Sequence, residues 1–340
     1  GLGERNNFDL NAYYFNVQDK DDSETEERKQ AIVHPALDYR YFMPDPVYGG
    51  ELSLTTNFTS LTRQNQDAYN LGNSIRYNGL EGSYTRLSTE AEWKRTFTFD
   101  SGLLLTPLLA ARGDALWTDM SANSFGTSLN YDGTINDDAA LRGMATFGLE
   151  ARYPILFTAL HSNHVIEPIA QIFVRPNESY AGELPNEDSQ AFVFDATNLF
   201  ERDKFSGFDR IEGGTRANLG FRYNGTFDNG YGIRAIAGQS FHIAGENSFA
   251  SNDLVNAGAN SGLETDRSDY VAMAAIDAPI GLSLSSSLRF DKDSLEVNRS
   301  ETAVTYTDNR VSGKVSYTQV DAQPEYGYDR KRDIIQASGK

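Results

Sequence analysis

The sequence has no cysteine, no long apolar run and a shortage of basic side chains. Without cysteine, its 340 residues form neither a disulfide nor a thiolate metal site. No stretch approaches the ~18 consecutive apolar residues that a membrane-spanning helix requires. Lys and Arg total 30 against 48 Asp and Glu, which gives a net charge of -18. This balance argues against nucleic acid as a partner, because binding to phosphates requires clustered Lys and Arg.

Aromatic residues and glycine are plentiful instead. The chain contains 18 Tyr, 20 Phe and 29 Gly. Together with many short alternating segments, this composition is typical of a β-sheet with one wet face. A soluble β-sandwich and a membrane β-barrel both fit it, so composition alone leaves both classes open.

The alternation of apolar and polar residues predicts about 14 strands and no helix. Apolar residues recur with a spacing of two, whereas an amphipathic helix would show spacings of three and four. The predicted strands lie at about 8–17, 31–43, 50–62, 84–99, 103–119, 139–157, 163–175, 214–227, 231–243, 268–278, 282–292, 300–307, 310–320 and 328–337.

The connections between these strands alternate between long and short. The long ones are 18–30, 63–83, 120–138, 176–213 and 244–267, with smaller ones at 293–299 and 321–327, and the short ones are 44–49, 100–102, 158–162, 228–230, 279–281 and 308–309. Outer-membrane barrels have tight periplasmic turns and long outer loops, whereas a soluble sandwich has no reason to keep this rhythm. The rhythm therefore predicts an all-β, antiparallel, up-and-down transmembrane β-barrel.

The two faces of the predicted strands agree with this interpretation. In 214–227, Leu219 and Phe221 lie on one face, and Arg216 and Asn218 lie on the other. The apolar face would contact lipid and the polar face would line a wet interior. We therefore expect Phe221→Arg and Leu284→Arg to impair assembly, and Asn218→Arg and Ser285→Arg to be tolerated better.

Three stretches of the chain resemble a known family. The first is HPALDYRY at 34–41, followed by GGEL at 49–52, Asn57 and Arg63; the second is EWKR at 92–95 with Gly102 and RGD at 112–114. The third is EPIAQ at 167–171, which includes Pro168, then PNEDS at 185–189, Asn198, Leu199 and Phe200, and FSGFDRI at 205–211, which includes Gly207, Asp209 and Arg210, followed by Gly214, Arg216 and Gly220. Over about residues 7–320 the chain resembles the central part of the barrel domain of the LptD family.

The resemblance implies a translocon that inserts lipopolysaccharide (LPS) into the outer leaflet of the outer membrane, and neither an enzyme nor a cofactor. It also implies an LptE-type lipoprotein plug inside the barrel, and an LptA-type periplasmic bridge that delivers LPS through a jelly-roll domain outside this sequence. LPS would leave between the first and last strands of the barrel. A general porin for small solutes is the alternative.

We expect residues 1–340 to form a single barrel domain without its closing strands. The strand at 8–17 is mixed on both faces, and the one at 328–337 contains a run of charges, so the two do not look built to pair. This predicts an open, curved sheet of about 14 strands from a larger barrel. The segment 176–213 would be an extracellular loop or a loop folded into the lumen.

Seven arginines fall on the polar faces of predicted strands: Arg112, Arg142, Arg152, Arg216, Arg222, Arg234 and Arg289. Because the guanidinium group fits phosphate geometry, they are candidates to line a path for phosphorylated lipid. A wet interior needs solvated side chains in any case, so the pattern alone does not establish contact with LPS.

Other constellations give weaker signals for function. Ser162 lies beside His161 and His164, but catalysis would also require an acid that converges on them in space. The four histidines show no metal-ligand spacing. The acidic segment 19–27 is more typical of a solvated loop than of a cation site. We therefore expect no catalytic and no metal site.

Overall fold

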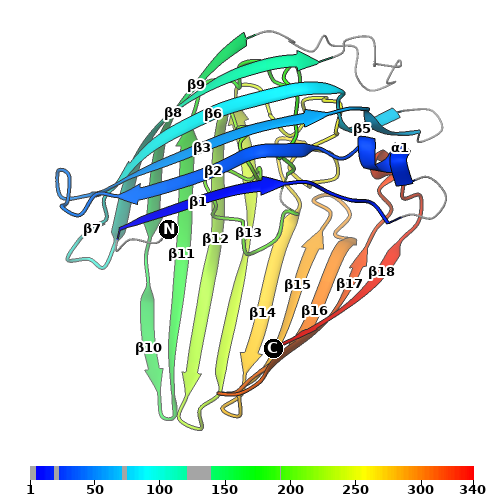
Figure 1. Cartoon of the computed structure of the whole chain (residues 1–340). Helices are drawn as coiled ribbons and strands as arrows, with labels where there is room; N and C mark the ends of the chain where they lie inside the picture. The colour runs from blue at the N-terminus through cyan, green and yellow to red at the C-terminus, as the bar shows by residue number, and fades with distance from the viewer. Residues whose placement is uncertain (1–4, 19–22, 71–74, 121–138, 192) are drawn as a thin grey trace.

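The computed structural model describes residues 5–18, 23–70, 75–120, 139–191 and 193–340, which form one curved antiparallel sheet (Figure 1). Among them, 14 strands follow one another in chain order: β1 (Asn6–Tyr13), β2 (Ile32–Phe42), β3 (Glu51–Arg63), β6 (Gly82–Lys94), β8 (Leu104–Met120), β9 (Ala139–Arg152), β11 (Ser162–Val174), β12 (Thr215–Phe227), β13 (Gly232–Ala244), β14 (Tyr270–Asp277), β15 (Leu282–Phe290), β16 (Val297–Thr307), β17 (Ser312–Val320) and β18 (Arg332–Gly339). The predicted all-β, up-and-down order is confirmed.

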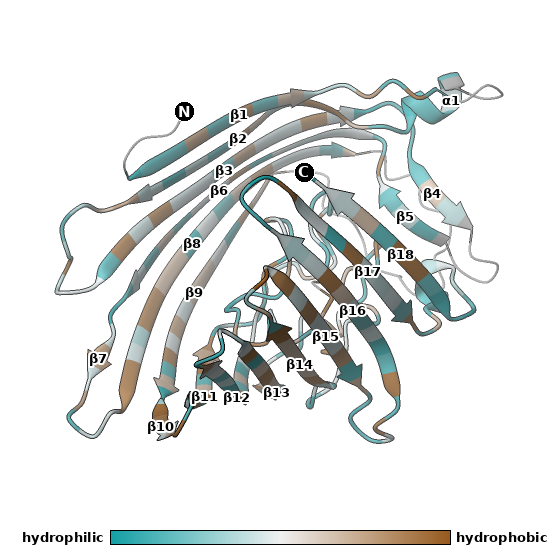
Figure 2. Ribbon diagram, turned by 90° about the horizontal axis from the view of Figure 1, so that it is seen from below, coloured by the Kyte–Doolittle hydropathy of each residue, from teal (hydrophilic) through white to brown (hydrophobic). Residues whose placement is uncertain are grey.

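The sheet is open. Within the described residues, β1 pairs only with β2, and β18 pairs only with β17. Figure 2, seen from below, shows the first and last strands on opposite sides of the hollow of the sheet. The prediction of a curved, unclosed sheet is therefore confirmed.

Within the described residues, no helix is both long enough and apolar enough to cross a membrane.

Short elements inside the long connections differ from the prediction. They are the helix α1 (Ser23–Arg28), the hairpin of β4 (Asp67–Asn70) and β5 (Ile75–Gly79), and a 3-10 helix (Pro324–Tyr326). The prediction of no helix was thus wrong at α1, where Glu24 and Glu26 in the first turn and Arg28 in the last favour a helix through its dipole. Six residues are too few to show a helical period. The predicted loop 120–138 and part of the acidic segment 19–27 lie outside the described residues.

The predicted strand 139–157 consists of two parts. β9 ends at Arg152 and β10 (Ile155–Ala159) continues along the same neighbour in the same register, because Arg152 pairs with Ile169 and Ile155 pairs with Ile166 of β11. Pro154 lies in the gap between them and has no N–H to donate to the ladder. In the same way, the predicted strand 84–99 consists of β6 and the short β7 (Phe97–Thr98).

The predicted faces of the strands are confirmed. Leu219, Phe221 and Leu284 point outward and are 49%, 46% and 47% exposed, whereas Arg216 and Asn218 are buried on the concave face. Figure 2 shows this alternation as teal and brown bands along the strands. Asn218 was expected to point into water, but it is 0% exposed because a loop covers it.

The concave face carries apolar cores of its own. One cluster joins Phe194, Leu199, Phe205, Phe249 and Leu263 from two loops to inward side chains of β13 and β14. The rings of Phe205 and Phe249 stack with their centroids 4.4 Å apart. The loops are therefore packed against the wall of the sheet as folded structure.

Candidate functional site

The longest connection crosses the concave face. The β11–β12 loop (residues 175–214) begins at β11 and reaches β3, where Glu187 forms a two-point ion pair with Arg63 through N–O distances of 2.8 and 2.7 Å. On the way it passes β9, β8 and β6. Figure 1 shows the loop inside the curve of the sheet.

Two aspartates of this loop cap each other's backbone. Asp209 Oδ2 accepts the N–H groups of Glu187 and Asp188 at 2.6 and 2.9 Å. Asp188 Oδ1 accepts the N–H groups of Phe208 and Asp209 at 3.0 Å each. This reciprocal arrangement fixes two distant turns of the loop against each other.

The same two aspartates attach the loop to β6. Arg86 donates to Asp188 Oδ2 at 2.9 Å and also binds Asp209, which in addition accepts a hydrogen bond from Tyr84. Arg86 is 0% exposed. A buried guanidinium requires opposite charges around it, and this loop supplies both.

The paired carboxylates respond differently to burial. Burial, reinforced by the charge of Asp188 and opposed by Arg86, raises the pKa of Asp209 to about 6. Burial alone would also raise the pKa of Asp188, but the charge and hydrogen bond of Arg86 lower it to about 2. The buried pair therefore holds its second negative charge less readily than its first.

A second buried cluster joins the loop to β9 and to the β13–β14 loop (residues 245–269). Glu178 accepts from Arg142 at 3.3 Å and from Arg210 at 3.1 Å. Arg210 also binds Asp253 and donates to the carbonyl oxygen of Ser248 at 2.8 Å. Arg210 thus couples the two long loops to each other.

A third cluster lies where the β11–β12 loop returns to β12. Glu212 accepts from Arg216 Nε at 2.6 Å and lies 3.4 Å from Arg175. Burial alone would raise the pKa of Glu212, but Arg175, Arg216 and Lys204 together lower it to about 2. Burial lowers the pKa of Lys204 to about 8.

The residues that carried the family resemblance lie mainly in these clusters. Asp209 and Arg210 are buried, Leu199 is in the apolar core, and Asn198 donates to the carbonyl oxygen of Val193 at 2.8 Å. Phe200 accepts from Gln171 at 3.1 Å through its carbonyl oxygen. Gly207 has φ +63°, and a Cβ there would lie 2.5 Å from the Asp188 carbonyl oxygen. Pro168 is apart from them, in β11 opposite Phe221.

The seven predicted arginines divide into two groups. Four have side chains at most 8% exposed and bind carboxylates under the loops: Arg112, Arg142, Arg216 and Arg289. The side chains of Arg152, Arg222 and Arg234 are 29%, 43% and 53% exposed. Arg152 and Arg222 share Glu167, at 3.7 and 3.3 Å, and Arg234 pairs with Asp277 at 2.8 Å. These three form a charged band low on the concave face.

Sequence reasoning did not identify the partners that hold the loop. Arg86 of β6 and Arg175, Glu178 and Glu212 of the loop were not singled out, and Arg63 and Asp188 appeared only within the stretches of the family resemblance. The inward parity of β6 would have found Arg86, since it alternates with the outward Leu87. No local signal identifies its partner Asp209, which is 123 positions away in the chain.

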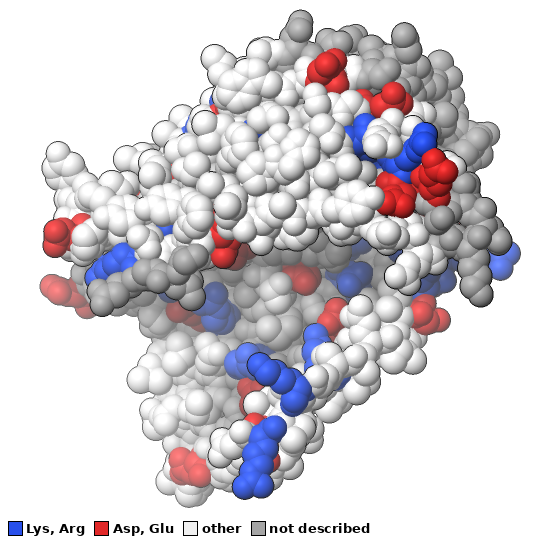
Figure 3. Space-filling view, in the orientation of Figure 1, with Lys and Arg blue, Asp and Glu red and all other residues white. Residues whose placement is uncertain are grey.

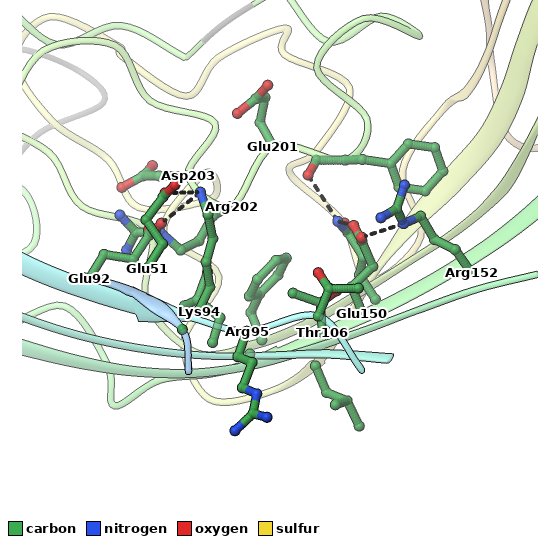
Figure 4. Close-up of a pocket in the computed structure, with 18 of the residues that line it drawn as sticks. Glu51, Glu92, Lys94, Arg95, Thr106, Glu150, Arg152, Glu201, Arg202 and Asp203 are labelled. Atoms are coloured by element: carbon green, nitrogen blue, oxygen red, sulfur yellow. Dashed lines mark hydrogen bonds and ion pairs between the residues drawn. The ribbon is translucent and has the colours of Figure 1, made fainter. Parts of the chain in front are cut away.

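A pocket of about 730 Å³ lies below the β11–β12 loop, between residues 200–203 and the ends of β3, β6, β8 and β9. Figure 4 shows Glu92 turned toward Arg202, at 3.1 Å, and Glu150 turned toward Arg152, at 2.9 Å, while Arg95 points away. Figure 3 shows the hollow of the molecule with acidic and basic side chains at its rim and inside it. The pocket is thus polar and of mixed charge.

Ser162 and His164 meet on the outward face. Ser162 Oγ lies 2.8 Å from His164 Nε2, and His164 Nδ1 lies 2.8 Å from the Tyr223 hydroxyl. His161 instead pairs with Asp228 at 3.1 Å. Within the part of the chain that the structure describes, the side-chain hydrogen bonds of His164 go to Ser162 and Tyr223 and to no carboxylate, so this group lacks the acid of a catalytic triad. No group of three or more potential metal ligands occurs in the described residues.

Comparison with known proteins gives one family match. The model of the family described as "LptD: LPS transport system D" matches residues 2–340. No curated protein matches the chain.

Solved structures of outer membrane phospholipase A are distantly similar. Two from Escherichia coli, one an active-site variant, are 9% and 8% identical, with a TM-score of 0.31 for each. In both comparisons the match covers 74% of this chain and 77% of the other. A calcium-bound dimer from Salmonella typhi is 9% identical with a TM-score of 0.27, and the match covers 74% and 78% of the two chains.

Proposed function

The chain belongs to the LptD family, and on this premise we propose that it forms part of the wall of a translocon that inserts LPS into the outer leaflet. The family is one of transport proteins rather than enzymes, and its place is the outer membrane.

The packing of the concave face supports a transporter over the alternative of a general porin. Water-filled pores of large barrels let small solutes pass. Here the β11–β12 and β13–β14 loops occupy the concave face with a dry core and buried ion pairs. This observation carries the proposal, because two loops packed in place across the concave face narrow the open passage that a general porin needs.

The exposed band of arginines suits the phosphate groups of LPS. Arg152, Arg222 and Arg234 keep part of their guanidinium surface accessible, and arginine binds phosphate through two parallel hydrogen bonds. Arg112, Arg142, Arg216 and Arg289 are already used by carboxylates under the loops. In this proposal the first three contact LPS and the other four hold the loops in place.

Two protein partners belong to the proposal. An LptE-type lipoprotein plug would contact the concave face, where the mixed-charge pocket below the β11–β12 loop offers both donors and acceptors. An LptA-type bridge would deliver LPS from the periplasm through a domain outside this sequence. Both partners come from the family relation, and the polar pocket is the feature that suits the first.

Depletion of the full-length protein tests the function. Newly made LPS should stop reaching the cell surface and accumulate further inside, as measured by surface labelling and membrane fractionation. Unchanged surface labelling after complete depletion would overturn the transport proposal, and loss of small-solute uptake instead would favour a porin.

A further inference from the structure

Three connections meet at the end of the sheet that carries the long connections. Arg76 of β5 donates from Nε to the carbonyl oxygen of Val255 in the β13–β14 loop at 3.1 Å, and its guanidinium carbon lies 4.7 Å from the centroid of the Tyr326 ring. Tyr326 belongs to the β17–β18 connection (residues 321–331). Contacts thus join the β4–β5 hairpin, the β13–β14 loop and the β17–β18 connection, and Figure 2 shows the hairpin beside β18.

The β17–β18 connection contacts the β13–β14 loop through its 3-10 turn Pro324–Tyr326. The hydroxyl of Tyr326 lies 2.9 Å from two carbonyl oxygens, those of Asn256 and Ala259. Asn260 donates to the carboxylate of Glu325 at 2.6 Å, and Asn256 donates to the carbonyl oxygen of Glu325 at 3.2 Å. Because a hydroxyl has a single proton, Tyr326 bonds one of its two carbonyls at a time. A few hydrogen bonds therefore hold the turn on the loop.

The two attachments of the β13–β14 loop differ in kind. On the side of β5, Leu254 is buried in an apolar cluster with Tyr77 and Leu80, and the N–H of Tyr77 donates to the carbonyl oxygen of Leu254 at 3.0 Å. On the other side, no residue of 321–331 outside Val320 of β17 is buried or belongs to a buried apolar cluster of the described chain. Local opening takes place where few apolar contacts are buried. The weaker attachment is therefore the one through the 3-10 turn.

The two asparagines that hold the turn have an unusual backbone. Asn256 and Asn260 have φ values of +55° and +54°, a region that asparagine tolerates better than most residues but that still costs free energy. Because both residues can relax once the turn has left the loop, this cost favours release.

We propose that the β17–β18 connection is a latch. While Glu325 and Tyr326 contact the β13–β14 loop, the connection closes the hollow of the sheet at the end of the long connections. When the turn leaves the loop, the connection swings away from β5 and opens the hollow at that end. The latch depends on these contacts and not on the transported molecule, so a failure of the transport proposal leaves this inference intact.

Distance measurements by electron spin resonance test the latch in the full-length protein, reconstituted in membranes. One pair of nitroxide labels replaces Tyr69 on β4 and Arg330 in the β17–β18 connection, which are both exposed. A reference pair replaces the exposed Asp45 and Asn309 in two short turns. The labels are attached through azide-bearing amino acids, so any cysteine of the full-length protein stays unlabelled. The first pair reports on the latch, and the second pair reports on general loosening of the sheet.

Four variants separate the contacts of the latch. Tyr326→Phe removes the hydroxyl and keeps the ring beside Arg76, and Tyr328→Phe, at an exposed tyrosine of the same connection, is its matched control. Asn260→Asp places a carboxylate against that of Glu325 at nearly unchanged size, so that like charges repel where a hydrogen bond was. Adding Glu325→Gln to Asn260→Asp restores one donor and one acceptor with their roles exchanged.

In the wild type, the first pair should give one narrow distance and a minor, longer population. The ratio of the longer population to the narrow one should rise about fivefold with Tyr326→Phe, as the loss of one hydrogen bond implies, and the longer population should dominate with Asn260→Asp. Tyr328→Phe and the double variant should match the wild type, and the reference pair should not change. The latch is overturned if Asn260→Asp leaves the first pair unchanged, if the double variant fails to restore it, or if both pairs broaden together.

Discussion

At the scale of single residues, Asp209 is the point on which the attachment of the β11–β12 loop depends most. One of its oxygens accepts two backbone N–H groups of the loop, and the other faces Arg86 and Tyr84 of β6. Replacement of a buried charge that is bonded on both sides leaves its partners without compensation. The loop and the wall therefore share this side chain.

We expect Asp209→Asn to destabilise the loop by roughly 3–5 kcal/mol, because it leaves Arg86 buried with Asp188 alone. If the new amide oxygen still accepts the two backbone N–H groups, the NH₂ group of the same side chain faces the guanidinium of Arg86. Both groups are then donors, and neither accepts a hydrogen bond from the other. Limited proteolysis and thermal unfolding of the reconstituted protein would measure the loss. Asp228→Asn is the matched control, since its side chain is 66% exposed; an equal effect of the two variants would contradict the role of Asp209.

The acid sensitivity of the loop follows from carboxylates whose folded pKa values are depressed. Asp188 and Glu212 each have a pKa of about 2 against ordinary values of 3.8 and 4.5. Their contribution to stability is present above the ordinary value and is lost as the pH falls toward 2. Asp209, with its pKa raised to about 6, acts in the opposite direction and lowers stability as the pH rises from about 4 to 6.

We therefore expect the unfolding temperature to fall steeply below about pH 4.5 and to vary little, or to rise slightly, as the pH falls from 6 to 4.5. Glu212→Gln should reduce the loss of stability in acid, because it removes a carboxylate whose pKa is depressed. Unfolding measured at pH 6, 4.5 and 3 in both proteins checks this. If the unfolding temperatures of the wild type and the variant fall by the same amount, Glu212 does not contribute to the loss of stability in acid.

At the scale of elements, the strands could be predicted because a period of two over 8 to 17 residues is a long signal. The interruptions could not be predicted as reliably, although Pro154 marks the one between β9 and β10 in the sequence. The exposure of the inward arginines could not be predicted from the sequence. Parity placed Arg216 and Arg222 on the same face, but only the covering loop makes one buried and the other half-exposed.

The outward faces carry a prediction that the structure sharpens. Phe221→Arg and Leu284→Arg should impair assembly, since Arg on the lipid face near the midplane costs ~2–4 kcal/mol. Ser285→Arg is the tolerated counterpart, because Ser285 is half-buried on the concave face.

Asn218→Arg is no longer a suitable control for these variants. Its amide binds Gln171 and Ser240 at 3.0 and 2.7 Å in a site without room for a longer side chain. Assembly can be measured by the fraction of protein that resists urea extraction from outer membranes. Equal assembly of the Phe221, Leu284 and Ser285 variants would contradict the assignment of faces.

At the scale of the whole molecule, the long connections fasten distant parts of the sheet to each other. Arg76 of β5, in the connection between β3 and β6, donates to the carbonyl oxygen of Val255 in the β13–β14 loop at 3.1 Å. Tyr326, between β17 and β18, donates to the carbonyl oxygen of Asn256 at 2.9 Å. The β13–β14 loop thus connects strands that lie far apart in the sheet. These contacts lie at the end of the sheet that carries the long connections. The hairpin turns at the other end make no such bridge in the described residues.

The orientation of the molecule in the membrane provides the last prediction. Long connections should face outward and short turns should face the periplasm. A protease-cleavable tag tests this only at a site where its insertion does not disturb the packing of the protein. The β13–β14 loop is unsuitable, because Phe249 and Leu263 are buried. Asp293, whose side chain is 64% exposed between β15 and β16, is a better site. A tag after Asp293 should be cleaved on intact cells, whereas one after Asn309, in the turn between β16 and β17, should be cleaved only after the outer membrane is permeabilised. The reverse pattern would mean that the short turns, and not the long connections, face the cell exterior.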